Sequence, residues 1–392
     1  MKYEKIKLSD LVDTVSDTRK INKDKVVLIN TSDIFDGDVL NHSYTDNYNL
    51  RGQFKKRFEK NDILYSEIRP ANKRFAYVDF DSEDYIASTK LMVLRRRSNS
   101  ITNKFLYYCL TNDFFTEKMQ HLAEARSGTF PQITFDVLKN ESINIPSIEN
   151  QNKITMILDN INNKIKSNNE INNNLHDLAE QQFNKIYSTG TTKKLDELLF
   201  NVSTGSRPKG GAQECGVPSI GAEKIEKFGV YDYSSEKYIS EDYYEKLKNG
   251  RLNSGDVLLY KDGAYTGKVS MCLNGFPHNK AAVNEHVFIL NTENNWAQNY
   301  LYFTLYNKDN KEMLHRLASS KAAQPGLNQV ELKSIEINIC EKEDIINFEK
   351  NVKPIMDKIA LNSLENKKLS ELRDSLLPKL MNGEIDLDNI EI

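Results

Sequence analysis

One glycine-rich segment in the second half of the chain has the composition of a phosphate-binding loop. Residues 263–269, GAYTGKV, place two glycines and a lysine close together, as a P-loop does. The segment is one residue short between its glycines, and Val269 stands where a Ser or Thr hydroxyl would bind Mg²⁺. We therefore expect no nucleotide site here, and we expect neither a cofactor nor a metal in this chain.

Other catalytic patterns are incomplete. Glu331 and Lys333 have the spacing of some metal-dependent nucleases, but Val137 replaces the carboxylate in a related segment of the first half. His176 lies in a helical pattern and is expected to be solvated or packed rather than a ligand. Neither a GxGxxG fingerprint nor a methyltransferase motif of the Asn-Pro-Pro-Tyr type occurs. The four cysteines are far apart in the sequence and form no CxxC pair, so neither a zinc ribbon nor a redox motif is present: they are Cys109, Cys215, Cys272 and Cys340. The sequence thus favours a protein that is not an enzyme.

The chain repeats itself with a constant offset of 194 residues. Asp62-Ile63-Leu64 recurs as Asp256-Val257-Leu258, and Ile143 and Ile145 recur as Ile337 and Ile339. The apolar pattern Leu175, Leu178, Phe183, Ile186 recurs as Leu369, Leu372, Leu377, Leu380. A period of this length corresponds to a whole domain plus one long helix rather than to a solenoid unit.

The repeat predicts two α/β (α+β) domains in tandem, each followed by a long helix. Short apolar runs such as residues 26–29 and 257–260 have strand length, and residues 105–122 and 299–317 have helical spacing. We expect domain boundaries at residues 1–147, 148–190, 191–342 and 343–385, followed by a tail of residues 386–392. Pro354 is expected to kink the second long helix or to mark its start.

The two long helices have the three-and-four spacing of a coiled-coil seam. Asn168 and Asn172 occupy seam positions of the first helix, and Asn362 and Asn366 stand at the equivalent positions of the second. Asparagine in such a seam reduces stability but fixes the register. Because both pairs lie near the middle of their helices, we expect antiparallel packing with the four amides in contact and a pseudo-twofold relation between the two repeats.

Composition gives weaker constraints. The 392 residues carry a formal net charge of −3, so any basic surface must be local. The N-terminal residues lack the apolar stretch of a signal peptide, and no apolar run reaches membrane-spanning length. We therefore expect a cytoplasmic protein.

The C-terminal segment 372–385, LRDSLLPKLMNGEI, resembles the end of the specificity subunits of type I restriction–modification systems. The resemblance covers nearly the whole chain. Residues 145–154 are similar to the entry into that family's central helix, and residues 217–225 and 255–268 are similar to its target recognition domains. In the first domain, residues 66–74 depart from the family's glycine-rich loop. The order of these segments, together with the repeat, makes the resemblance specific.

The resemblance implies a non-catalytic subunit that binds a bipartite, asymmetric site in double-stranded DNA. It implies two copies of an adenine-N6 methyltransferase subunit and ATP-dependent restriction subunits as partners, with S-adenosylmethionine and ATP bound in those partners. Residues 1–147 and 191–342 would be the two target recognition domains. Two alternatives remain: the specificity subunit of a related type IIB/IIG-like system, and a coiled-coil adaptor that does not bind DNA.

Polar and basic loops supply the candidate DNA contacts that this resemblance implies. Arginine can read guanine, Asn and Gln can read adenine, and Lys and Ser usually hold phosphate. Arg95-Arg96-Arg97 is left open between a phosphate contact and plain surface. In the first domain the candidates are Arg69, Asn72, Lys73, Arg74, Arg126, Ser127 and Thr129. In the second they are Arg207, Lys209, Lys261, Tyr265, Lys268, Lys321 and Gln324.

Overall fold

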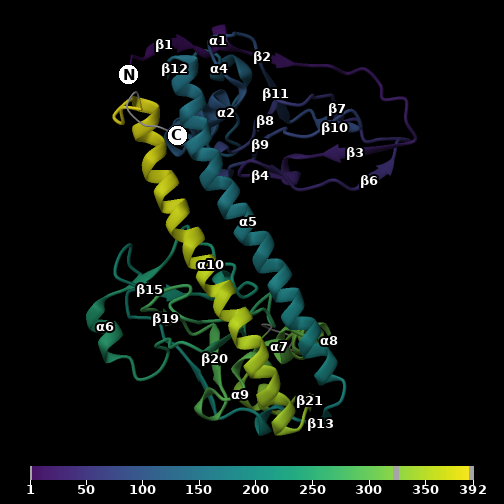
Figure 1. The fold of residues 1–392 in the computed structure, drawn as a ribbon, viewed down its shortest axis with the longest axis vertical. Coiled ribbons are helices and arrows are strands. Elements are labelled where there is room, and N and C mark those ends of the chain that lie inside the picture. The colour runs from purple at the N-terminus through teal and green to yellow at the C-terminus, as the bar shows by residue number, and fades with distance from the viewer. Residues whose placement is uncertain (1, 321–325, 388–392) are drawn as a thin grey trace. The chain divides into compact units, whose positions relative to one another are not determined.

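The computed structural model describes residues 2–320 and 326–387, and these form two compact units. Unit 1 comprises Met1–Asn162 and Glu371–Ile392, and unit 2 comprises Asn163–Ser370. Each long helix, α5 (Ile148–Tyr187) and α10 (Lys342–Asn382), therefore contributes one part to each unit (Figure 1). Within the described residues, none of the helices combines the length and the apolar character needed to cross a membrane.

Unit 1 is built from short strands and four short helices. The helices are α1 (Leu8–Leu11), α2 (Asn103–Thr111), α3 (Asp113–Arg126) and α4 (Phe135–Leu138). The strands are β1 (Glu4–Lys7), β2 (Val12–Val15), β3 (Lys25–Ile29), β4 (Ile34–Phe35), β5 (Asp38–Val39), β6 (Tyr44–Asp46), β7 (Phe54–Lys56), β8 (Ile63–Ser66), β9 (Phe75–Tyr77), β10 (Tyr85–Ser88), β11 (Leu91–Arg96) and β12 (Ser142–Ile145).

The core of unit 1 lies between an antiparallel sheet and helices. Strands β2-β11-β8-β9 form that sheet, whereas β6-β3-β10-β7 form a second, mixed sheet. Phe105 of α2 and Met119 of α3 are fully buried against the first sheet's inner face, together with Leu158 of α5 and Leu380 of α10. The ends of both long helices thus complete the core of this unit.

Unit 2 has a related composition. Its helices are α6 (Glu241–Lys246), α7 (Gln298–Tyr306), α8 (Lys308–Ser319) and α9 (Gln329–Ser334). Its strands are β13 (Thr191–Lys194), β14 (Asn201–Thr204), β15 (Val217–Ile220), β16 (Tyr238–Ile239), β17 (Val257–Tyr260), β18 (Val269–Met271), β19 (Ala282–Val283), β20 (Val287–Asn291) and β21 (Glu336–Ile339).

In unit 2, an antiparallel sheet of order β14-β20-β17-β18 packs under α7, and β16-β15-β19 form a smaller mixed sheet. Helix α7 is buried on nearly all sides, which explains why Tyr300, Tyr302 and Phe303 are almost completely inaccessible. Phe183 of α5 and Met356 of α10 are buried in the same cluster. The long helices therefore form one wall of this core as well.

Equivalent hydrogen bonds occur in both units. The pairing of β1 with β12 aligns Ile6 with Ile143, and the pairing of β13 with β21 aligns Lys193 with Ile337. Just before β8, the Asp62 carboxylate accepts the Glu59 N–H at 2.7 Å. Before β17, the Asp256 carboxylate accepts the Asn253 N–H at 2.8 Å, 194 residues further along the chain. The offset found in the sequence is therefore also an offset between local structures.

Two helical expectations were wrong in detail. Each predicted helix, 105–122 and 299–317, is a pair of helices divided at an asparagine, Asn112 or Asn307. The side chain of each asparagine caps the second helix, so the chain turns while the apolar spacing continues. Helix α10 begins at Lys342, so Pro354 does not mark its start. Buried Val352 and Met356 flank this proline and hold the helix to the core on both sides of it.

Within unit 2, α5 and α10 run antiparallel and exchange hydrogen bonds through asparagines. The Asn362 amide N–H donates to the Asn172 Oδ1 at 2.9 Å, and the Asn168 amide donates to the Asn366 Oδ1 at 2.8 Å. The Asn172 amide also donates to Ser363 Oγ at 3.1 Å. Because Asn168, Asn172 and Asn362 are at most 8% exposed, a change of register would leave these amides without partners.

A half-buried carboxylate joins α10 to the start of α7. The N-cap residue of α7 is Ala297, whose methyl side chain cannot accept a hydrogen bond from the helix. Glu349 of α10 caps α7 instead. Its Oε1 accepts the Tyr300 N–H at 2.8 Å and its Oε2 accepts the Asn299 amide at 2.7 Å. Burial nevertheless raises the pKa of Glu349 to about 7, because these hydrogen bonds only partly offset the lost hydration.

The asparagine pairing predicts a coupling between two substitutions. Asn172→Leu alone should reduce the free energy of unfolding of unit 2 by about 1–3 kcal/mol, because Asn362 loses a buried partner. Adding Asn362→Leu should recover part of that loss. Hydrogen exchange of residues 163–187 during urea denaturation measures both effects, and the exposed Asn174→Leu is the matched control. Additive losses in the double variant would contradict this account.

The raised pKa of Glu349 predicts a stability that falls with pH. The folded-state pKa of about 7 lies above the unfolded value of 4.5, so its contribution is complete below pH 4.5 and is lost as pH rises through 7. The total loss is at most about 3 kcal/mol. Glu349→Gln should flatten the pH profile of the unfolding midpoint between pH 5 and 8, whereas exposed Glu343→Gln should leave it unchanged. A Glu349→Gln variant that kept the wild-type slope would refute the assignment.

Candidate nucleic-acid interface

In unit 1, the two predicted groups of polar residues lie next to each other. The segment after β8 pairs with the segment after α3: the Ile133 N–H donates to the Glu67 carbonyl at 2.7 Å, and the Arg69 N–H donates to the Pro131 carbonyl at 3.0 Å. Arg69 has a positive φ of 45°, a conformation that few residues other than glycine adopt. These backbone bonds hold it there and leave its side chain exposed.

Only some of these side chains remain available. Arg74 donates to the Ser32 and Ile34 carbonyls at 3.2 and 3.0 Å, and Lys73 forms an ion pair with Asp113 at 2.7 Å. Both therefore have structural roles. Arg69 and Asn72 are exposed, and their side chains make no hydrogen bond or ion pair with the residues that the structure describes. They are the strongest candidates of this loop.

The segment that follows α3 is exposed along its whole length, from Arg126 to Phe130. The Ser127 hydroxyl accepts the Phe130 N–H at 3.2 Å, and Arg126 lies 3.5 Å from the Thr134 hydroxyl. Thr129 is exposed as well. Arg95, by contrast, makes a bidentate pair with buried Asp62, both bonds 2.7 Å long, and is best explained as structural.

In unit 2, the candidates of the β17–β18 loop and the β14–β15 loop are largely held by carboxylates. Lys261 pairs with Asp262 at 2.7 Å, Arg207 pairs with Glu285 at 2.8 Å, and Lys268 pairs with Glu226. Lys209 and Tyr265 are exposed. Lys321 and Gln324 lie outside the described residues.

The β17–β18 loop packs on α8 and forms one side of a groove of about 490 Å³. Gly267 allows this approach, because it has a φ of 99° and a Cβ at its position would lie 3.2 Å from the Lys311 carbonyl oxygen. The residues that line the groove are Ala264, Tyr265, Thr266, Lys268, Lys308, Lys311, Glu312, His315 and Arg316.

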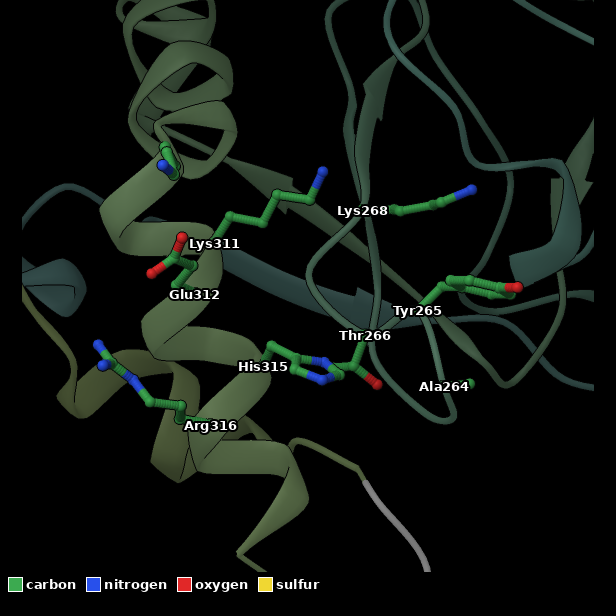
Figure 2. Close-up of a pocket in the computed structure, with 9 residues that line it drawn as sticks. Ala264, Tyr265, Thr266, Lys268, Lys311, Glu312, His315 and Arg316 are labelled. Atoms are coloured by element: carbon green, nitrogen blue, oxygen red, sulfur yellow. The ribbon is translucent and has the colours of Figure 1, made fainter. Parts of the chain in front are cut away.

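Positive charge dominates this groove. Figure 2 shows Lys311 and His315 projecting from α8 toward the loop that carries Tyr265 and Lys268. The amine of Lys268 lies 4.8 Å from the centre of the Tyr265 ring, which is 64% exposed. Lys308, Lys311 and Arg316 have no ion-pair partner among the described residues, so their charge is available to a polyanion.

The residues contributed by α8 were not among the predicted contacts. Lys308, Lys311 and His315 are spaced by three and four residues and therefore share one helix face. This spacing was visible in the sequence, but it says nothing about which loop the face meets. Only the fold brings α8 to the loop that contains Tyr265 and Lys268.

Comparison with known proteins relates the chain to one family. Residues 1–177 match the family described as type I restriction modification DNA specificity domain. The chain is 29% identical over 432 residues to the type I restriction enzyme HindI specificity subunit of Haemophilus influenzae, covering 92% of this chain and 94% of that protein. It is 22% identical over 317 residues to the type I restriction enzyme MjaIX specificity subunit of Methanocaldococcus jannaschii, covering 74% and 71%.

A solved structure has a similar fold. The crystal structure of the type I restriction–modification system S subunit from M. genitalium aligns with a TM-score of 0.58 and 16% identity, over 97% of this chain and 96% of that one. The sequence similarity extends over nearly the full length of the HindI subunit. The chain is thus similar, over nearly its whole length, to a protein named as a type I restriction enzyme specificity subunit.

Proposed function

We propose that this chain binds a bipartite, asymmetric site in double-stranded DNA and directs the other subunits of a type I complex to it. The observation that carries the proposal is the groove between α8 and the β17–β18 loop. The cations that α8 contributes to this groove lack carboxylate partners among the described residues. The chain is also similar to a type I restriction enzyme specificity subunit. Phosphate binding by such cations releases condensed counterions, which is the main source of affinity for DNA.

Different side chains would serve different purposes. Lys308 and Lys311 are flexible point charges suited to phosphates, which fix the position of the protein on the duplex. In unit 1, Arg69 and Asn72 have the groups needed to contact guanine and adenine edges in the major groove. The ion pairs of Arg207 and Lys261 would orient these cations rather than remove them from the interface.

We propose that the two units are tandem recognition domains and that each reads one half of the site. The equivalent hydrogen bonds around Asp62 and Asp256 support a common origin of the two units. The long helices would form an antiparallel coiled coil whose register, fixed by the asparagine pairs, sets the number of unread base pairs.

The proposed partners are two adenine-N6 methyltransferase subunits and ATP-dependent restriction subunits, with S-adenosylmethionine and ATP bound there. A related type IIB/IIG-like system would use the same recognition chemistry with a different nuclease. A coiled-coil adaptor would not require the basic groove face that Lys308 and Lys311 give to α8.

Loss of charge in the groove should weaken DNA binding without regard to sequence. The double variant Lys308→Gln/Lys311→Gln should flatten the dependence of log affinity on log salt by about 1–2 for the complex with its methyltransferase partner, since each phosphate contact contributes about 0.9. Fluorescence anisotropy with cognate and random duplexes measures this slope. Lys194→Gln, on β13 outside the groove, is the matched control, and an unchanged slope in the double variant would show that the groove does not contact DNA.

Exchange of whole domains tests the proposed function directly. Replacing residues 1–147 by the first domain of another specificity subunit should change one half of the methylated sequence, and replacing residues 193–341 should change the other half. Methylation mapping in a host that expresses each chimera with its partner gives the answer. A single exchange that altered both halves would overturn the proposal of independent recognition.

A further inference from the structure

One imidazole nitrogen in the core of unit 2 has no hydrogen-bond partner among the described residues. His176 of α5 is 1% exposed and packs against the rings of Tyr302, Phe303 and Tyr306 of α7. Its Nε2 lies 2.9 Å from the Tyr302 hydroxyl, but its buried Nδ1 forms no hydrogen bond within the described part of the chain. His176 is packed, as expected from the sequence, but its Nδ1, unpartnered among the described residues, argues against the further expectation that this residue is not a ligand.

Hydrogen bonding fixes the orientation of this ring. The Tyr302 oxygen accepts the Phe228 N–H at 3.2 Å and contacts Nε2 of His176, so the ring cannot turn over without breaking this chain. With the proton on Nε2, the lone pair of Nδ1 is free to bind a ligand.

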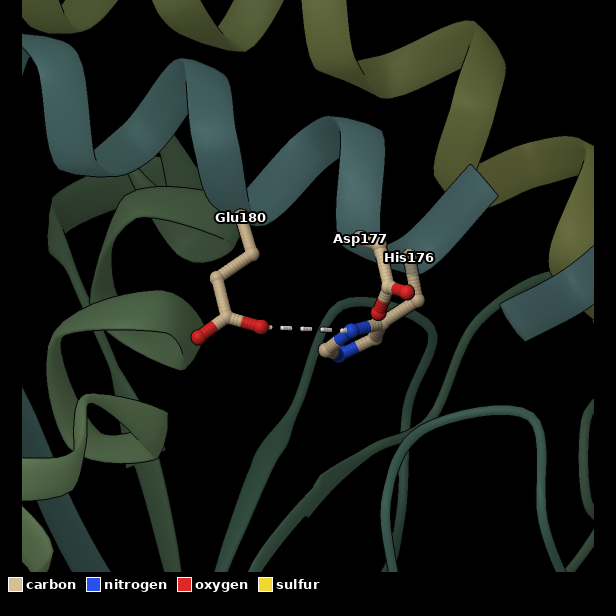
Figure 3. A group of neighbouring side chains, drawn as sticks. All are labelled: His176, Asp177 and Glu180. Carbon is tan, nitrogen blue, oxygen red and sulfur yellow. Dashed lines mark ion pairs between the residues drawn. The ribbon is translucent and has the colours of Figure 1, made fainter. Parts of the chain in front are cut away.

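Two carboxylates face this nitrogen. Glu180 Oε2 lies 3.9 Å from Nδ1, and one ring nitrogen of His176 and one oxygen each of Asp177 and Glu180 all lie within 4.8 Å of one another. Figure 3 shows His176 and Asp177 leaving one turn of α5 and Glu180 leaving the next, with Nδ1 of His176 paired with Glu180. Asp177 is exposed and Glu180 is 35% exposed, so both carboxylates meet the solvent, whereas Nδ1 itself is buried beneath them.

The geometry points to a binding site for one divalent first-row transition ion, of the Zn²⁺, Co²⁺ or Ni²⁺ type, held by His176 Nδ1, Asp177 and Glu180. One imidazole nitrogen and two carboxylates form a donor set that these ions accept, whereas Mg²⁺ and Ca²⁺ prefer oxygen ligands alone. Ligand atoms around tetrahedral zinc lie about 3.3 Å apart, so the observed 3.9 Å needs only a small rotation of Glu180.

The surroundings agree with this assignment. The bond between Nε2 and Tyr302 is the outer-sphere contact that orients a metal-binding histidine.

An opposing feature is Lys227, whose amine binds the Asn173 side chain at 2.7 Å and whose charge acts on both His176 and Glu180. The offset of 194 places Ser370, Glu371 and Asp374 at the equivalent positions of α10, without an imidazole. One ion per chain is therefore expected, not two.

The test uses the full chain, stripped of metal with EDTA and desalted. Cobalt binding is followed by visible absorption, and Zn²⁺ is then titrated by calorimetry. We expect one ion per chain, a binding constant at least about tenfold weaker in Glu180→Gln and in Asp177→Asn, and tighter binding in Lys227→Gln. Zn²⁺ should also raise the Tm of the wild type, because it binds only the folded form. Glu170→Gln, an exposed residue of the same helix, should match the wild type throughout.

Neither carboxylate variant alters the buried ring, so both should fold with the melting temperature of the metal-free wild type. Absence of uptake by the wild type would overturn the site. Equal affinity in the Glu180→Gln and Glu170→Gln variants would also overturn it, because the ion would then be held elsewhere, for example at exposed Cys215. The result is independent of whether the chain binds DNA.

Discussion

The hydrogen bond between Asn172 and Asn362 is the constraint from which the arrangement of unit 2 follows. Both amides are buried, and together with Ser363 they satisfy one another at one register of α5 against α10. Any other register would set an amide against apolar side chains at a cost of about 1–3 kcal/mol for each lost partner. Apolar packing alone would tolerate several registers, so the polar residues provide the specificity that the seam lacks.

The position of the candidate interface depends on this pairing. Once α5 and α10 are aligned, Phe183 and Met356 form one wall of the core, and α7 packs into it. Glu349 of α10 then caps α7 and ties its first turn to the same wall. Because α8 follows α7 after a single asparagine, the basic face of α8 is placed beside the Tyr265–Lys268 loop. The position of the basic face of α8 therefore depends on the hydrogen bonds that join α5 to α10 and α10 to α7.

The features that could be predicted from the sequence are those that recur in both halves or follow a strong period of apolar residues. The offset of 194 residues, the long helices and the seam asparagines required only apolar spacing and comparison of the two halves. The division of the helices at Asn112 and Asn307 was missed because the helical spacing of apolar residues continues across the turn. An asparagine is a favoured N-cap residue and could have indicated the start of a new helix. Asparagines are so common in this chain, however, that these two did not stand out.

The candidate site was harder to predict, because charge depends on tertiary partners. Lys73 and Arg74 have the same appearance in the sequence as Arg69, yet they bind Asp113 and the carbonyls near Phe35. The cations of α8 are separated from the loop they face by about forty residues of sequence. Ion pairs and grooves of this kind are decided by the fold, and no local pattern distinguishes a free lysine from a paired one.

We propose that this chain alone determines which DNA sequence its complex modifies. Methylome sequencing of a host that expresses the chain with its methyltransferase partner tests this claim most directly. We expect N6-methyladenine at a single asymmetric motif with two specified halves and an unread gap, and no such motif when the chain is omitted. Methylation at the same motif without the chain, or at a continuous motif with no gap, would contradict it.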